Sequence, residues 1–141
     1  MRFWDTSALV AIVVSEAATS RVRRWMAEDG VVVVWTLTRV EILSALARRR
    51  RAAPRAAARY LVARRELMDA WERWTEIAAV DLVRGHAERL VEGYPLRAAD
   101  ALHLGAALVA SDGDPGSLEF VTLDEAQASA AEREGFRVLG P

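Results

Sequence analysis

The stretch VVVVW, residues 31–35, decides the fold class. It is β-branched, continuous and hydrophobic, which is typical of a parallel strand that is buried on both faces. Gly30 precedes it, and Thr38 begins a helical pattern shortly after it. The segment therefore predicts a central strand in a sheet that helices cover on both sides.

The alternation of short apolar segments with helical patterns continues along the whole chain. Further strands are predicted over residues 2–4, 77–80, 119–123 and 136–139. Helices are predicted over residues 6–27, 38–47, 54–75, 81–93 and 125–133, and from residue 95 up to a loop at 112–116. Because strands that alternate with helices imply βαβ units, the predicted class is α/β with a parallel sheet.

Composition limits the classes of protein and of chemistry. The 141 residues are 52% hydrophobic, which predicts a single domain over residues 1–141 with a substantial core. There is no cysteine, which excludes disulfides and thiolate metal sites, and all 19 basic residues are arginine, which excludes a P-loop lysine and Schiff-base chemistry. No apolar stretch reaches the roughly 18–20 residues that a membrane span needs, so we expect a soluble, cytoplasmic protein.

Carboxylates follow the predicted strands, at the edge of a parallel sheet where ligands bind. They are Asp5, Glu41, Asp81 and Asp124, and Asp100 comes from the helix that leads into the fourth strand. Since Asp100 is predicted to lie a full turn inside its helix, helix capping does not explain it.

The other acids also have structural interpretations. Thr38 to Glu41 and Thr122 to Glu125 each match a capping box, while Asp5 and Asp81 suit ordinary helix caps. If instead several of these carboxylates converge, they repel one another unless protons or cations lie between them. Hard cations such as Mg²⁺ and Mn²⁺ prefer such oxygen ligands.

The two histidines do not offer a zinc site as an alternative. His86 belongs to a different predicted helix from His103. His103 is therefore without a histidine partner, and we expect it to pack or to form hydrogen bonds rather than to bind metal.

Four motifs, in order, give the chain its family resemblance. They are FWDTSALV at residues 3–10, TRVEILSAL at 38–46, LRAADALHLGAAL at 96–108 and FVTLDEAQASAA at 120–131. Over nearly its whole length the chain resembles the PIN domain family, and more narrowly the VapC-type ribonuclease toxins of toxin–antitoxin pairs. The resemblance implies a three-layer α/β/α sandwich whose five-stranded sheet has the order 3-2-1-4-5.

The resemblance also implies the roles of the site residues. Asp5, Glu41, Asp100 and Asp124 would be the catalytic, metal-binding acids, and Ser7 and Thr6 would supply supporting hydroxyls. They would hold one or two Mg²⁺ or Mn²⁺ ions, which activate a water molecule for hydrolysis of RNA phosphodiesters. The implied partners are an RNA substrate such as tRNA or rRNA, a VapB-like antitoxin and a second copy of the chain in a homodimer.

Arginines are concentrated in one part of the chain. Between residues 39 and 73 there are ten arginines against four acids, although the net charge of the chain is −1. The run consists of Arg48, Arg49, Arg50 and Arg51, followed by Arg55. It fits a solvated helix face, a surface that tracks RNA phosphates or a docking site for an acidic antitoxin segment.

Two other functions remain open at the level of sequence. A receiver-like signalling domain also gathers acids at strand ends, although it relies on a lysine that this chain lacks. A PIN-like module that binds RNA without cutting it has the same sequence pattern as a nuclease. A haloacid-dehalogenase-like phosphatase is disfavoured because Asp5-Thr6-Ser7 lacks the second aspartate of an Asp-x-Asp motif.

Overall fold

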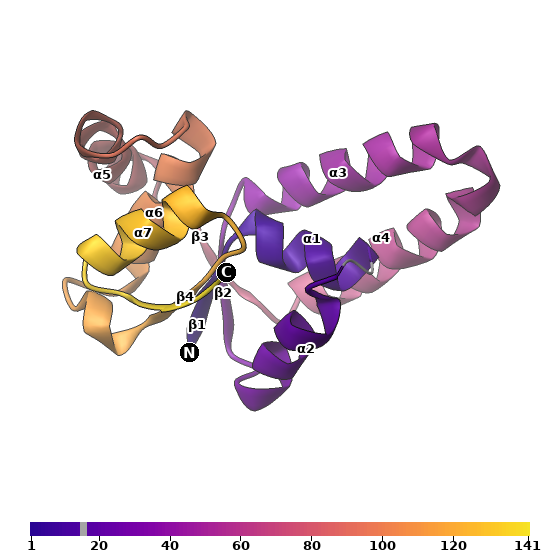
Figure 1. The fold of residues 1–141 in the computed structure, drawn as a ribbon, viewed down its shortest axis with the longest axis horizontal. Coiled ribbons are helices and arrows are strands. Elements are labelled where there is room, and N and C mark those ends of the chain that lie inside the picture. Colours follow the sequence, from indigo (N-terminus) through magenta and orange to yellow (C-terminus); the bar gives the residue numbers. More distant parts are fainter. Residues whose placement is uncertain (15–16) are drawn as a thin grey trace.

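The structure, a computed structural model, describes residues 1–14 and 17–141, and these residues form one five-stranded parallel sheet of order β3-β2-β1-β4-β5 (Figure 1). The strands are β1 (Arg2–Trp4), β2 (Val32–Trp35), β3 (Thr75–Ile77), β4 (Glu119–Val121) and β5 (Arg137–Leu139). The α/β class and the strand order expected from the resemblance are both confirmed.

Helices cover both faces of this sheet. They are α1 (Thr6–Val14), α2 (Thr19–Glu28), α3 (Thr38–Ala52), α4 (Ala57–Trp71), α5 (Val80–Gly93), α6 (Ala98–Ala110) and α7 (Glu125–Arg133), with short 3₁₀ turns at Pro54–Ala56 and Pro115–Ser117. Figure 1 shows α1 to α4 on one side of the strands and α5 to α7 on the other, with α3 and α4 paired as a projecting hairpin. The result is the expected three-layer sandwich.

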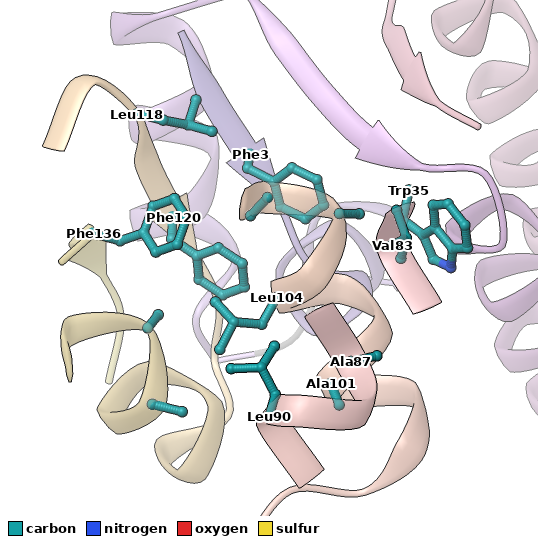
Figure 2. Close-up of a cluster of buried hydrophobic side chains, with 14 of the residues drawn as sticks. Phe3, Trp35, Val83, Ala87, Leu90, Ala101, Leu104, Leu118, Phe120 and Phe136 are labelled. Carbon is teal, nitrogen blue, oxygen red and sulfur yellow. The ribbon is translucent and has the colours of Figure 1, made fainter. Parts of the chain in front are cut away.

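Successive residues of each central strand belong to opposite cores, as the two-residue period of a strand requires. Phe3 and Phe120 lie with Leu104 and Leu90 beneath α5, α6 and α7 (Figure 2). Trp4, which follows Phe3, packs instead with the residues of α1 to α4. Because both faces of β2 are buried, this strand has no polar face, which explains the uninterrupted apolar pattern of Val32–Trp35, although Val31 before it is exposed.

Several predicted element boundaries are wrong. The helix predicted over 6–27 is two helices, α1 and α2, and residues 15–16 lie outside the described residues. The strand predicted over 77–80 is β3 at Thr75–Ile77, because α4 ends at Trp71 and α5 already begins at Val80. The arginine-rich segment extends α3 to Ala52, beyond the predicted end at residue 47.

The sheet order positions the site. From β1 the chain continues to β2 and β3 on one side, and β4 and β5 then add on the other side of β1. In open parallel sheets this change of direction opens a crevice beyond the carboxyl ends of the strands. In the described part of the chain, no helix is both long enough and apolar enough to cross a membrane.

Candidate active site

The predicted acids lie along one cleft at this switch point. Asp5, Glu41, Asp100 and Asp124 all line a cleft of about 1040 Å³. They come from four separate segments: the end of β1, the first turn of α3, the first turn of α6 and the start of α7. The tertiary structure therefore brings them together, as the sequence analysis expected, whereas Asp81 does not line the cleft.

Asp5 is buried directly after β1, and hydrogen bonds reach only one of its two carboxylate oxygens within the described chain. Its backbone N–H donates to the carbonyl of Val121 in β4, at 2.9 Å. Its Oδ2 accepts hydrogen bonds from the backbone N–H and the hydroxyl of Ser7, at 3.0 and 2.5 Å, and lies 3.2 Å from the hydroxyl of Thr122. Ser7 thus donates two hydrogen bonds to the Asp5 carboxylate, which is the contact that a supporting role would need.

Glu41 does not take part in the predicted capping box. The N-cap of α3 is Leu37, and the hydroxyl of Thr38 is buried with no hydrogen-bond partner in the described structure. Glu41 Oε2 instead accepts hydrogen bonds from the hydroxyl of Thr6 and from His103 Nε2, the latter at 2.9 Å. Burial alone would raise the pKa of Glu41, but the hydrogen bond and charge of His103, together with Thr6, lower it.

Asp100 lies in the first turn of α6, so the prediction that it lies a full turn inside the helix is wrong. The helix begins at Ala98 rather than at Pro95, and Asp100 Oδ2 accepts a hydrogen bond from the backbone N–H of Arg97 at 3.2 Å. Partial burial raises the pKa of Asp100, and the negative charges of Asp124 and Asp5 raise it further. Capping therefore explains one oxygen of Asp100, and burial, followed by the nearby carboxylates of Asp124 and Asp5, explains its raised pKa.

Asp124 is itself the N-cap of α7, which corrects the predicted box that began at Thr122. Its Oδ1 accepts from the backbone N–H of Gln127 at 2.8 Å. The buried side chain of Gln127 also donates to the carbonyl of Asp100 at 3.2 Å and accepts from the hydroxyl of Thr122 at 2.7 Å. Gln127 and Thr122, which the sequence analysis did not single out as site residues, thus connect the segments that carry three of the acids.

Asp81 is not a helix cap, since Ala79 is the N-cap of α5. Its carboxylate is exposed and pairs with Arg84 at 2.8 Å, one turn along the same helix. It is an ordinary surface acid and offers a matched control for the four acids in the cleft.

His103 lies inside the acidic cluster, with only 2% of its surface exposed. Its Nε2 contacts Glu41, and its Nδ1 is 3.6 Å from Asp5 Oδ1. Burial would lower the pKa of His103, but the negative charges of Asp5, Glu41 and Asp100 raise it. The expectation that His103 forms hydrogen bonds is confirmed. It lies three residues after Asp100, and this spacing already indicated that the two side chains share one face of the helix.

The arginine run divides between different surfaces. Arg48 and Arg49 line the acidic cleft from α3, and Arg97 lines it from the start of α6. Arg50 lines a separate small groove between α3 and α4. Arg51 and Arg55 are exposed and do not line the cleft. The lining of the cleft therefore combines three arginines with four acids.

The donor set of the cleft fits an open divalent-cation site. Within the described residues, no group of three or more Asp, Glu or His side chains is arranged to hold a metal ion as it stands. Mg²⁺, however, is usually bound by one or two carboxylates together with water and substrate phosphate. No hydrogen bond from the described chain reaches the second oxygens, which are Asp5 Oδ1, Glu41 Oε1, Asp100 Oδ1 and Asp124 Oδ2.

The sequence matches a known family profile, described as PIN domain, over residues 2–133. The chain belongs to the PIN domain family. PIN domains are generally nucleases. Comparison with curated protein sequences gives no match.

Solved structures share this PIN fold at low sequence identity. The structure of FitAB bound to an IR36 DNA fragment is 15% identical with a TM-score of 0.64, covering 100% of this chain and 95% of that chain. FitAcB from Neisseria gonorrhoeae is 17% identical with a TM-score of 0.60, covering 99% and 96%. VapBC2 from Rickettsia felis, bound to a DNA fragment from its promoter, is 10% identical with a TM-score of 0.62, covering 99% and 97%.

Proposed function

We propose that this PIN domain is an endoribonuclease that depends on Mg²⁺ or Mn²⁺ and acts as the toxin of a VapBC-type toxin–antitoxin pair. The observation that carries the nuclease proposal is the convergence of Asp5, Glu41, Asp100 and Asp124 along one cleft. The raised pKa of Asp100 supports it, because its causes include the charges of Asp124 and Asp5 as well as burial. Such repulsion favours the binding of a cation.

The chain's own residues would position the reactants. The N–H and hydroxyl of Ser7 hold Asp5, and the N–H of Gln127 holds Asp124, so that each acid keeps one oxygen for a ligand. One or two bound ions would offset the charge of the phosphodiester and lower the pKa of a water molecule. Arg48 from α3 and Arg97 from the start of α6 line the cleft and would bind the flanking phosphates of a single-stranded or looped RNA.

The direct test is cleavage of labelled single-stranded and hairpin RNAs, such as tRNA and rRNA fragments, with Mn²⁺ or Mg²⁺. We expect Asp5→Asn and Asp100→Asn to abolish cleavage while circular dichroism shows an intact fold. Asp81→Asn is the matched control, because Asp81 is an exposed acid outside the cleft, and it should cut at the wild-type rate. Wild-type cleavage by Asp100→Asn would remove Asp100 from the site.

The alternative is a PIN-like module that binds RNA without cutting it. The arginines that line the cleft are compatible with both functions. The same experiment separates them, because the alternative predicts RNA binding in a mobility-shift assay and intact RNA at every metal concentration. EDTA should abolish cleavage under our proposal and leave RNA binding by the alternative unchanged.

The toxin assignment rests on the resemblance to VapC-type toxins together with the similarity of the fold to FitAB and VapBC2. We expect expression of the chain to arrest bacterial growth and a VapB-like antitoxin, encoded beside it, to relieve the arrest. We also expect a homodimer in the cytoplasm, as the resemblance implies. Light scattering of the isolated chain tests whether it is a homodimer. Normal growth of bacteria that express the chain would contradict the toxin role.

A further inference from the structure

His103 is a polar side chain in the middle of α6, in which Asp100 is the only other polar side chain. Within α6 its neighbours Leu104, Ala106 and Ala107 are fully buried in the core. His103 is also fully buried, and its Nδ1 has no hydrogen-bond partner in the described structure. Burying an imidazole with an unpaired nitrogen costs free energy, so core packing alone does not explain this residue.

The contacts of Nε2 define what His103 does. Nε2 lies 2.9 Å from Glu41 Oε2 and 3.1 Å from the hydroxyl of Thr6. Because a carboxylate oxygen only accepts hydrogen bonds, Nε2 carries the proton and donates it to Glu41. The hydroxyl of Thr6 donates to the same oxygen, so two donors fix Oε2 and leave Oε1 without a donor from the described chain.

Glu41 needs such support because its side chain is long and extends into the cleft from α3 without a capping contact to its own helix. It is the one acid of the four that extends from α3. A glutamate has three rotatable side-chain bonds, so fixing it costs entropy that a specific contact must offset. His103, three residues from Asp100 on α6, bridges the gap between the two helices.

We propose that His103 is a positioning residue, which together with Thr6 holds Glu41 in the rotamer that presents its Oε1 to a divalent cation in the cleft. The inference rests on the proposed function, since it assigns a role within the same site. It predicts that loss of the His103 contact weakens cation binding without removing any ligand. Changes to such supporting contacts typically reduce metal affinity by about 10- to 100-fold.

The first test is the affinity of the metal-free protein for Mn²⁺, measured by isothermal titration calorimetry. We expect His103→Leu to bind Mn²⁺ about 10- to 100-fold more weakly than the wild type. His103→Gln, which retains a side-chain N–H donor, should recover part of that loss. His86→Leu is the control, because His86 is the second histidine and lies outside the cleft, and its affinity should equal that of the wild type.

The second test needs neither metal nor RNA. The ¹⁵N NMR signals of the His103 imidazole in the intact chain should show a protonated, hydrogen-bonded Nε2. Glu41→Gln should shift the Nε2 signal, whereas Asp124→Asn should not, since Asp124 makes no contact with His103 among the described residues. This measurement remains decisive if His103→Leu does not fold.

The outcomes distinguish this inference from the proposed function. Equal Mn²⁺ affinity of the wild type and His103→Leu would overturn the role of His103 and leave the nuclease proposal intact. An Nε2 signal that does not respond to Glu41→Gln would do the same. Failure of the wild type to bind Mn²⁺ at all would overturn both proposals.

Discussion

Asp5 illustrates how a single side chain acquires a defined place at a strand end. Its Oδ2 is surrounded by the N–H and hydroxyl of Ser7 and by the hydroxyl of Thr122. The hydroxyl of Ser7 also accepts a hydrogen bond from the backbone N–H of Leu123 at 2.9 Å. Ser7 therefore joins the acid after β1 to the loop that precedes Asp124.

At this scale we predict that Ser7→Ala destabilises the protein and slows RNA cleavage, because it removes one donor to Asp5 and leaves the N–H of Leu123 unpaired. The expected loss in free energy of unfolding lies at the lower end of about 1–3 kcal/mol, since Leu123 is only half-buried. Urea denaturation and initial cleavage rates measure the two effects.

Ser44→Ala is the control for this prediction. Ser44 is exposed and lines the same cleft, and its hydroxyl forms no hydrogen bond within the described residues. Its replacement should change the free energy of unfolding by less than about 0.5 kcal/mol. Equal destabilisation by the two variants would show that the Ser7 contacts do not support Asp5.

One face of helix α6 lines the cleft, and another packs against α5. Asp100 and His103 lie on the side toward the cleft. Gly105 is buried where α6 meets α5, and a Cβ there would lie 2.8 Å from the carbonyl oxygen of Val83. The glycine thus allows the two helices to pack closely and keeps α6 in the position that presents its polar residues.

We predict that Gly105→Ala is destabilising, because a backbone atom of α5 must move to admit the methyl group. Overpacking costs about 1–3 kcal/mol and outweighs the gain of about 1 kcal/mol in helix propensity. Gly85→Ala on α5 is the matched control, since an added Cβ at Gly85 meets nothing within 4 Å. It should raise the melting temperature, while Gly105→Ala should lower it.

A second contact joins α5 to the end of α7. Arg89 donates two hydrogen bonds to Glu134, at 3.0 and 2.6 Å, and the hydroxyl of Tyr94 donates a third at 2.8 Å. The hydrogen bonds of Arg89, followed by that of Tyr94, outweigh burial and lower the pKa of Glu134.

This shift makes stability depend on pH with a definite sign. A carboxyl whose pKa is lower in the folded state than in the unfolded state stabilises the fold above its unfolded pKa. That contribution is lost as the pH falls through the folded pKa. We therefore expect the melting temperature of the wild type to fall more steeply on acidification than that of Glu134→Gln, whereas Glu132→Gln, at an exposed neighbouring acid, should follow the wild type.

Across the whole molecule, charge is distributed unevenly. Four acids and three arginines, Arg48, Arg49 and Arg97, line the same cleft. A polyanion that enters this cleft meets these arginines, and a cation would neutralise the acids. The two signs of charge are thus arranged for a phosphodiester that contacts both.

We predict that Arg48→Gln weakens RNA binding and flattens its dependence on salt, because each phosphate contact contributes about 0.7 to the slope of log K against log salt for single strands. The measurement is a fluorescence titration in EDTA at several salt concentrations, where no cleavage occurs. Arg51→Gln, at an exposed position outside the cleft, should leave the slope unchanged. Equal slopes for all three proteins would make the arginine run a plain solvated face.

The sequence by itself determined the α/β class, the apolar strands and the acids that follow them, because strand and helix periods and helix-breaking residues act locally. The exact ends of α3, α4 and β3 were not predicted: alanine and arginine are strong helix formers and continue α3 to Ala52, and no glycine or proline marks the end of α4 at Trp71. The local sequence patterns did not predict the strand order either, and this prediction came from the resemblance to PIN domains.

Only the tertiary structure decided how the acids are held. Local pattern assigned Glu41 to a capping box with Thr38, but packing turned it toward His103 and Thr6, which are 62 and 35 residues away along the chain. Asp100 and Asp124 keep local capping contacts with the N–H groups of Arg97 and Gln127. For these two acids the tertiary structure decided only their place in the cleft, whereas for Glu41 it also decided the hydrogen-bond partners. The reason is that hydrogen bonds between distant segments compete with local ones, and burial between α3 and α6 favours the distant partners.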